Sequence, residues 1–307
     1  MKKSLKDARK VTIIVAMLLL VTGLVLTFSN HLVWLNAEEG LVVYDPVNFR
    51  KKPSTESKII DEIDFGKKVK VLNEEDGWLK VKYDGNVGYV VSESVTMKRV
   101  ILDISDYNWG NEYNSIKEFK EFTERAQEST KFAGYYIQVL RADDINENWQ
   151  EIVEALDEMK VPYGLYMYTS ASTEKEFKVE YNHYEKLVTG VDLKYNKYPF
   201  MIDLENGKNQ TEVIEYLQDN LGEEFVVYAN ANTMTQYGYH EMVEQYWVAH
   251  YEIRNNIPFQ DYAMHEKAIV GLEPVIWQYT NEGSDVLFGT THLDVNVVDE
   301  DWYQKYN

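Results

Sequence analysis

Residues 200–205 read Phe-Met-Ile-Asp-Leu-Glu, a short apolar run that ends in two acidic residues. A run of this length and composition is typical of a buried strand. The amphipathic stretch at 211–221 then predicts a helix, and the apolar run at 225–228 predicts a second strand. A strand, a helix and a strand in succession indicate a parallel β-α-β unit.

The same alternation extends in both directions along the chain. Further strands are predicted at 100–105, 135–140, 163–168, 246–249 and 275–279, and further helices at 115–129, 149–159 and 173–188. Seven or eight parallel strands favour a barrel over an open sheet. The last strands lie close together with little helix between them. We therefore expect an α/β fold, an irregular (β/α) barrel.

Residues 40–99 have a different pattern. Short strands separated by turns are predicted at 42–44, 59–60, 68–71, 78–83 and 88–91, which indicates a small all-β barrel. Charge separates the two regions as well. Residues 40–99 hold 11 Lys and Arg against 10 Asp and Glu, whereas residues 100–307 hold 15 against 38. This step predicts three parts: a leading segment at 1–39, a first domain at 40–99 and a second at 100–307.

The leading segment has the features of a membrane anchor. A basic stretch precedes an apolar run at 11–28, which as a helix would cover about 27 Å. The position of the basic residues predicts a single-pass anchor in the cell membrane, with its amino terminus in the cytoplasm and the rest of the chain outside. A cleaved signal peptide ending near Ala37 is the alternative. In either case the two domains work outside the membrane.

Composition excludes several classes of function. The 307 residues include 31 Lys and Arg and 51 Asp and Glu, for a net charge of −20, which argues against nucleic acid as a partner. The chain has no cysteine, so a disulfide, a thiol nucleophile and a cysteine-ligated zinc are excluded. The six histidines show no close metal-binding spacing. We expect neither a metal nor a cofactor.

Acidic residues stand where the predicted strands end, at the edge of a parallel barrel that carries the chemistry. Asp103 lies near the end of the first strand, Asp203 and Glu205 end the fourth, and Asp294 follows the last. Residues two apart in a strand share a face, so two neighbouring carboxylates should repel each other and raise the pKa of at least one. A carboxyl that keeps its proton near neutral pH is suited to glycoside cleavage. Acids at solvated strand ends are the alternative, and the spacing does not settle the stereochemistry.

Aromatic residues near the same strand ends are candidates for stacking on sugar rings. They are Tyr107, Tyr168, Tyr228, Trp277 and Tyr279. A mid-strand aromatic in a barrel is as often a core residue, so both interpretations stay open for each.

The order of the motifs gives a resemblance. The second domain carries Asp-Ile-Ser-Asp-Tyr-Asn-Trp at 103–109, Ile-Asp-Leu-Glu at 202–205, Trp-Gln-Tyr-Thr at 277–280 and Leu-Asp-Val-Asn at 293–296, and it resembles glycoside hydrolase family 25 lysozymes, the N-acetylmuramidases. The resemblance implies cleavage of the β-1,4 bond between N-acetylmuramic acid and N-acetylglucosamine. It implies Glu205 as acid/base, Asp203 as the residue that stabilises positive charge or steers the acetamido group of the substrate, and Asp103 and Asp294 as supporting acids. Residues 138–143, Gln-Val-Leu-Arg-Ala-Asp, depart from the Lys and Glu-Gly of many members, and Asn108 replaces a more usual Gln.

The first domain resembles bacterial SH3-type (SH3b) wall-binding modules. The resemblance rests on Asn-Phe-Arg at 48–50, Gly-Lys-Lys-Val at 66–69, Gly-Trp-Leu-Lys-Val at 77–81 and Asp-Gly-Asn-Val-Gly-Tyr-Val at 84–90. It implies adhesion to peptidoglycan, and a spacer role is the alternative. The sequence thus predicts a membrane-anchored muramidase of a Gram-positive envelope with peptidoglycan as its partner. A non-catalytic wall-binding or scaffolding protein, and a hydrolase of another amino-sugar polymer, stay open.

Overall fold

The computed structural model describes residues 38–42, 46–64, 66–109, 111, 113–128, 131–251, 271–280 and 294–307. It divides into two compact units, the first ending at Val95 and the second running from Thr96 to Asn307. The expected membrane segment at 11–28 lies outside the described residues. Among the helices that the structure does describe, none has the length and apolar character needed to cross a membrane.

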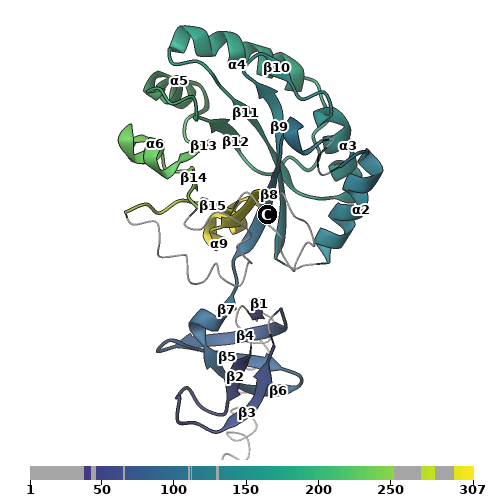
Figure 1. Cartoon of the computed structure of the whole chain (residues 1–307), viewed down its shortest axis with the longest axis vertical. Coiled ribbons are helices and arrows are strands. Elements are labelled where there is room, and N and C mark those ends of the chain that lie inside the picture. The colour runs from purple at the N-terminus through teal and green to yellow at the C-terminus, as the bar shows by residue number, and fades with distance from the viewer. Residues whose placement is uncertain are drawn as a thin grey trace, which may run out of the picture. The chain divides into compact units, whose positions relative to one another are not determined.

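The first unit is an all-β sheet of seven strands (Figure 1). They are β1 (Glu38–Val42), β2 (Val47–Arg50), β3 (Ile59–Ile63), β4 (Lys68–Glu75), β5 (Trp78–Tyr83), β6 (Asn86–Val91) and β7 (Val95–Thr96), in the order β3-β2-β6-β5-β4-β1-β7. Phe49, Ile63 and Val81 are fully buried between the strands. The small all-β domain is confirmed. Strand β2 was not predicted. Its only alternation is that of buried Val47 and Phe49 on either side of exposed Asn48, and a pattern this short does not indicate a strand.

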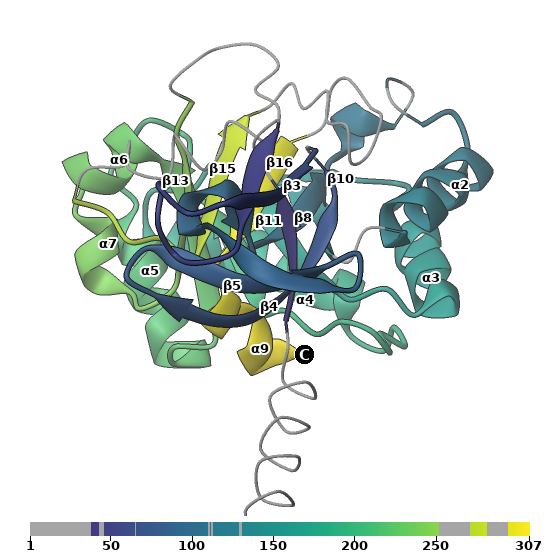
Figure 2. The same cartoon turned by 90° about the horizontal axis from the view of Figure 1, so that it is seen from below.

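The second unit contains a closed barrel of eight strands (Figures 1 and 2). They are β8 (Arg99–Ile104), β9 (Phe132–Arg141), β11 (Tyr163–Tyr168), β12 (Phe200–Asp203), β13 (Phe225–Asn230), β14 (Tyr246–Ala249), β15 (Ile276–Thr280) and β16 (Asp294–Val298). The barrel closes because β8 pairs with both β9 and β16. A two-residue strand, β10 (Asp144–Ile145), adds to the outer end of β9. The predicted α/β barrel is confirmed.

One strand of the barrel runs against the others. The seven barrel strands before β16 pair in parallel with one another, but β16 is antiparallel to both β15 and β8. The prediction that Asp294 follows the last strand is therefore wrong, since Asp294 opens β16 and lies directly opposite Asp103 of β8. This strand is where the expected irregularity of the barrel lies.

Helices cover the outside of the barrel. The four long ones are α2 (Ile116–Gln127), α3 (Trp149–Met159), α4 (Glu174–Val188) and α5 (Thr211–Leu221), and each agrees closely with its predicted range. Sequence signals fix two of their starts: the Ser115 side chain accepts from the Glu118 N–H, and Thr173 caps α4 in the same way. The shorter α6 (Ala231–Gln236), α7 (Tyr239–Met242) and α9 (Glu300–Tyr306) were not predicted, because four to seven residues give too little periodicity.

Aromatic rings fill the interior of the barrel. Tyr136 and Trp247 are fully buried with ring centroids 5.2 Å apart, and Tyr228 meets Trp247 edge-on at 5.3 Å. Gly164 permits this packing, because a Cβ there would collide with the Tyr136 ring. Above this filled floor a cavity opens at the carboxyl ends of the parallel strands, the edge at which barrel enzymes carry their active sites.

Candidate active site

A cavity of about 180 Å³ opens at the carboxyl ends of the barrel strands. The structure brings all four predicted acids to it, from three strands and one loop. The lining residues are Asp103, Ser105, Gln138, Tyr166, Met201, Asp203, Glu205, Tyr228, Trp247 and Asp294.

Asp203 and Glu205 both line the cavity, and they lie two residues apart in the chain. Strand β12 ends at Asp203, so Glu205 lies in the loop that follows rather than in the strand as predicted. Leu204 between them is fully buried and does not line the cavity. Its N–H donates to the Tyr228 carbonyl, which holds the chain against β13 just beyond the end of β12. The two carboxyl groups therefore face one space, although the strand itself is shorter than expected.

The carboxyl group of Asp203 is available to a ligand. Its Oδ1 atom is buried and has no hydrogen-bond partner among the described residues. Burial, and then the charge of Glu205, raise the pKa of Asp203 well above its ordinary value, while the charge of Arg141 opposes the rise. An orphaned oxygen of this kind is expensive to bury unless a ligand completes it.

Glu205 lies exposed at the mouth of the cavity. Loss of surrounding water raises the pKa of Glu205, a hydrogen bond with the Asn230 side chain lowers it, and the charge of Asp294 raises it, with a net upward shift. The Oδ1 atom of Asn230 accepts from the Thr233 N–H at 3.0 Å, where it caps α6. Because the cap occupies this oxygen, the amide nitrogen of Asn230 is the group left to donate to Glu205.

Asp103 and Asp294 form a coupled pair on facing strands. Burial, and then the charge of Asp294, raise the pKa of Asp103 well above its ordinary value. The pKa of Asp294 rises only to about 6, because hydrogen bonds from Asp103 and Gln278 favour its carboxylate form. The pair therefore holds a proton on Asp103 that is donated to Asp294.

Three amide side chains support the acids. The Nδ2 atom of fully buried Asn296 donates to Asp103 Oδ2 at 3.0 Å, and its Oδ1 atom accepts from Trp247 Nε1 at 3.0 Å. Gln278 accepts from the Tyr228 hydroxyl at 2.6 Å. With Asn230, these residues orient the site. Gln278 and Asn296 stand in the motifs at 277–280 and 293–296, but no role followed from those motifs alone. Tyr251, whose pKa is raised by burial and by the charge of Asp294, also approaches the site.

The predicted aromatic residues divide into two groups. Tyr228 lines the cavity, Tyr168 is half-buried beside Asp203 in the register of the sheet, and Tyr107 is 70% exposed in a neighbouring groove. Trp277 and Tyr279 are 6% and 1% exposed and do not line the cavity, which favours the core interpretation for these two. The reason is the phase of β15, whose Ile276 and Gln278 face the barrel interior, so that the alternate residues face outwards.

The described part of the chain contains no group of three or more His, Asp or Glu side chains placed to hold a metal ion. The chemistry available to these residues is proton transfer and charge stabilisation by carboxyl groups, in a water-poor setting that strengthens both.

Comparison with known families decides the assignment. The model of glycosyl hydrolases family 25 matches residues 102–286, more than half of the chain, and the model of a bacterial SH3 domain matches residues 45–96. The chain belongs to glycosyl hydrolase family 25. The enzyme class predicted from the sequence, a glycoside hydrolase with lysozyme activity, is thereby confirmed, as is the bacterial SH3-type module ahead of it.

Solved structures similar to the chain include family 25 members. The catalytic domain of endolysin ply40 from bacteriophage P40 of Listeria monocytogenes is 18% identical over 68% of this chain and 97% of its own, with a TM-score of 0.47. GHIP, a glycosyl hydrolase 25 of Streptococcus pneumoniae, is 16% identical over 68% and 92%, with a TM-score of 0.49. A family GH25 lysozyme from Aspergillus fumigatus is 12% identical over 68% and 99%, with a TM-score of 0.48. The search of curated proteins returned no match.

Proposed function

We propose that this protein cleaves the β-1,4 bond between N-acetylmuramic acid and N-acetylglucosamine in peptidoglycan, while anchored in the membrane of a Gram-positive cell. One observation carries the enzymatic part: four carboxyl groups surround a single cavity at the barrel mouth, and burial raises the pKa of each. Family membership and the SH3-type module support peptidoglycan as the substrate and binding partner.

Glu205 is the proposed general acid. It is the most exposed of the four acids and stands at the mouth, where a glycosidic oxygen can reach it. Its pKa is raised by burial, which favours the protonated form that a general acid needs. That proton passes to the glycosidic oxygen as the bond to C1 breaks, and the departing sugar leaves as a neutral alcohol. Asp103 is unsuited to the role, because its proton is already donated to Asp294.

Asp203 is the proposed orienting residue. Its unpartnered Oδ1 atom can accept the N–H of the acetamido group of the substrate. The acetamido oxygen then faces C1, bonds to it as the glycosidic bond breaks, and forms an oxazolinium ring. The Glu205 carboxylate next removes a proton from water, whose oxygen attacks C1 and reopens the ring. Such assistance by the substrate is an established exception to the scheme of two catalytic carboxylates.

Analysis of the products tests the reaction. Purified peptidoglycan is digested with the full chain, the new reducing ends are reduced with borohydride, and the fragments are identified by mass spectrometry. We expect reduced muramic acid at the ends and none after treatment with Glu205→Gln. Reduced glucosamine would assign cleavage of the other glycosidic bond, whereas an absence of new ends would support the non-catalytic wall-binding alternative. If the protein releases products only from a different amino-sugar polymer, that polymer is its substrate instead.

Anchoring is proposed from the basic stretch and the apolar run at 11–28, with both domains on the outer side of the membrane. We expect the protein to stay with membranes after a carbonate wash, to be released by detergent, and to be digested by protease added to protoplasts. An amino terminus at or near residue 38, found by sequencing the mature protein, would instead show cleavage and secretion.

A further inference from the structure

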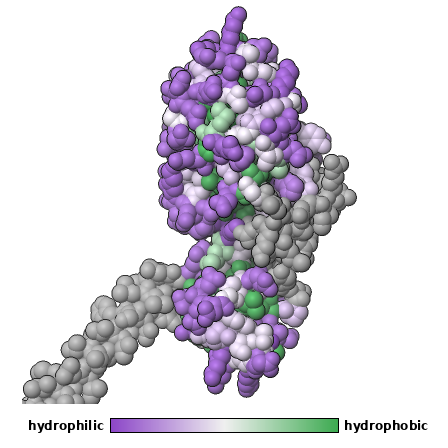
Figure 3. All heavy atoms as spheres, turned by 90° about the vertical axis from the view of Figure 1, so that its left-hand side faces the viewer, coloured by the Kyte–Doolittle hydropathy of each residue, from purple (hydrophilic) through white to green (hydrophobic). Residues whose placement is uncertain are grey.

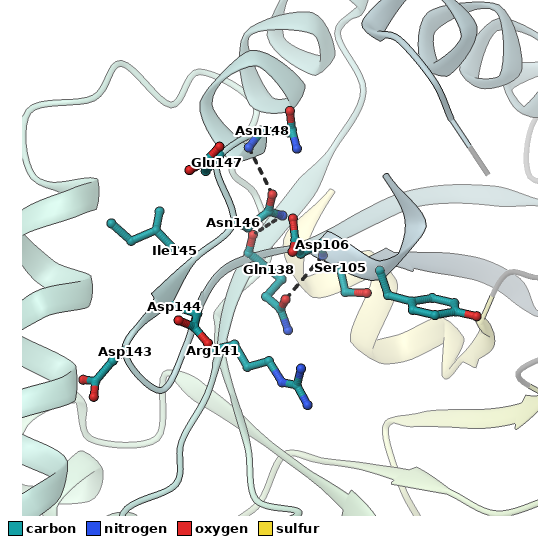
Figure 4. A pocket seen from close by; sticks show the side chains of 11 residues that line it. Ser105, Asp106, Gln138, Arg141, Asp143, Asp144, Ile145, Asn146, Glu147 and Asn148 are labelled. Atoms are coloured by element: carbon teal, nitrogen blue, oxygen red, sulfur yellow. Dashed lines mark hydrogen bonds between the residues drawn. The ribbon is translucent and has the colours of Figure 1, made fainter. Parts of the chain in front are cut away.

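A groove of about 910 Å³ lies beside the acid cavity and shares Ser105 and Gln138 with it (Figure 4). Its other lining residues come from the end of β9 and from the β8–α2 and β9–α3 connections. Four of them are acidic, namely Asp106, Asp143, Asp144 and Glu147, and one, Arg141, is basic. The chemistry proposed above does not use this groove.

A bulge in β9 aims Arg141 at this space. Gln138 pairs with Tyr166 and Leu140 with Met167, so Val139 is an extra residue without a partner in β11. Residues three apart in a regular strand point to opposite faces, but one inserted residue returns them to the same face. Gln138 and Arg141 therefore both face the barrel mouth, and in Figure 4 the Arg141 side chain extends away from the Asp143 and Asp144 carboxylates.

Both side chains keep hydrogen-bond donors for a ligand. Gln138 is only 6% exposed, and its Oε1 atom accepts from the Asp106 N–H, so its Nε2 atom faces elsewhere and has no acceptor among the described residues. The Arg141 guanidinium contacts the Tyr168 ring at 5.8 Å and makes no ion pair or hydrogen bond with any described residue. An amide nitrogen and a guanidinium that both keep free donors together suit a carboxylate.

The position of Arg141 relates the groove to the reacting sugar. Arg141, Tyr168 and Asp203 lie in one row across β9, β11 and β12. Two strand spacings separate Arg141 from Asp203, about 10 Å between Cα atoms. A substituent of the sugar held at Asp203 can therefore reach the guanidinium.

We propose that this groove binds the peptide stem of the muramyl substrate, with Arg141 and Gln138 on a stem carboxylate and the acidic residues facing its free amine. The inference rests on the proposed function. A peptide stem offers both charges, whereas a bare glycan strand offers only the carboxylate of its lactyl group. The acidic residues on the far side of the groove can bind the amine of a stem, so the groove suits a stem better than a bare glycan strand.

The test compares two substrates and two matched variants of the full chain. The substrates are soluble glycan strands with intact stems and the same strands after an amidase has removed the stems. The variants are Arg141→Gln and, as control, Arg125→Gln. Arg125 is an exposed arginine of α2 whose guanidinium also lies 5.8 Å from a ring, that of Phe122, but away from the groove.

For Arg141→Gln we expect kcat/KM on strands with stems to fall about 10- to 100-fold. The fall should come mainly from a higher KM, because one charge-assisted contact with the stem is lost. The lost charge also removes an effect that lowers the pKa of Asp203, and this acts on both substrates alike. Activity on stripped strands should therefore fall by less than about threefold, and Arg125→Gln should match wild type on both. An equal loss on both substrates, a loss confined to stripped strands, or no loss would overturn the stem site. Failure of the wild type to cleave either substrate would overturn the proposed function, and this assignment with it.

Discussion

The hydrogen bond between Asn230 and Glu205 shows how single side chains tune the site. Asn230 is held by its cap on α6, and the amide nitrogen then favours the carboxylate form of Glu205. Burial acts in the opposite sense and is the larger effect. The general acid thus has a raised pKa that is restrained by one neutral neighbour, so replacing that neighbour should move the pH dependence without removing a catalytic group.

Asn230→Ser should shift the alkaline limb of the pH–activity profile to higher pH. Serine still caps α6 but is too short to reach Glu205. Without the bond that lowers it, the pKa of Glu205 rises, and the protonated acid persists to higher pH. Profiles of kcat/KM measure this shift. Asn232→Ser, on the exposed side of the same helix, is the control, and a limb that stays in place or moves to lower pH contradicts the coupling.

The raised pKa of Asp294 predicts a pH-dependent cost in stability. A carboxyl with an ordinary pKa of 3.8 that rises to about 6 on folding keeps its proton longer in the folded than in the unfolded state. The contribution of this retained proton to the free energy of unfolding is fully present below about pH 4 and is lost as pH rises through about 6. Wild type should therefore lose stability relative to Asp294→Asn between pH 4 and 7, by at most about 3 kcal/mol.

Urea unfolding of both proteins at the two pH values measures that difference. Asp219→Asn, on the exposed face of α5, controls for the general effect of removing a negative charge. A gap between wild type and Asp294→Asn that is the same at both pH values would show that Asp294 titrates as an ordinary carboxyl.

At the residue scale the sequence predicted the acids and missed their partners. Asp103, Asp203, Glu205 and Asp294 stand at strand ends, which a pattern of apolar runs reveals. Amide groups such as Asn296 carry no charge and no spacing signal, so only the closed barrel shows that they complete the hydrogen bonds. Whether an aromatic residue faces the cavity depends on which residues of its strand point inwards, and the sequence did not determine this for β15.

At the scale of elements, β16 joins the two ends of the barrel and carries part of the site. Strand β16 pairs with β8 along five residues and places Asp294 opposite Asp103. Asn296, two residues further, turns to the same inner face and bonds to Trp247 and Asp103. The alternation of strands and helices predicted the parallel strands, but β16 is antiparallel to both of its neighbours, a topology that this alternation does not indicate.

Asn296→Ala should destabilise the second unit by about 2–4 kcal/mol. The substitution removes the acceptor of the buried Trp247 indole N–H and the amide that donates to Asp103 Oδ2, and each lost buried partner costs about 1–3 kcal/mol. Denaturant unfolding measures the change. Asn220→Ala removes an exposed amide whose hydrogen bond stays within α5, and it should cost less than about 0.5 kcal/mol. Equal stability of the two variants would show that the buried network contributes little.

The bulge in β9 is an element that no sequence pattern announced. The run Gln-Val-Leu-Arg has the composition of an ordinary strand, and only the pairing with β11 shows that Val139 is extra. An uninterrupted strand would have turned Arg141 away from the mouth. The position of this cation is therefore a property of strand pairing and lies beyond what local propensity determines.

At the scale of the whole molecule, charge distinguishes the two units. Residues 100–307 carry a net charge of −23, while residues 40–99 carry +1. Hydrophilic side chains cover most of the face shown in Figure 3. Anionic wall polymers should repel the catalytic unit at long range, an effect that salt screens beyond about 8–10 Å. A module that binds the wall offsets this repulsion by raising the local concentration of enzyme.

Removal of residues 1–95 should lower activity on intact walls while sparing activity on soluble fragments. The cut falls at the boundary between the two compact units and keeps Met97, whose carbonyl accepts from Lys131 Nζ. We expect about a tenfold loss on walls at low salt, smaller at high salt, with rates on soluble glycan within about twofold. Wall suspensions at two ionic strengths measure this, and unchanged activity at low salt would refute the role of the first unit.

The most direct test of the central claim is the turnover of Glu205→Gln, measured as reducing ends released from soluble glycan strands. We predict that kcat falls about 10²–10⁴-fold, the contribution of a positioned general acid, while circular dichroism and binding of the strands stay as in wild type. The loss should be far smaller on an aryl glycoside, whose leaving group needs no proton. Activity close to wild type on the natural strands, in a folded variant, would contradict the assignment of Glu205 as the acid.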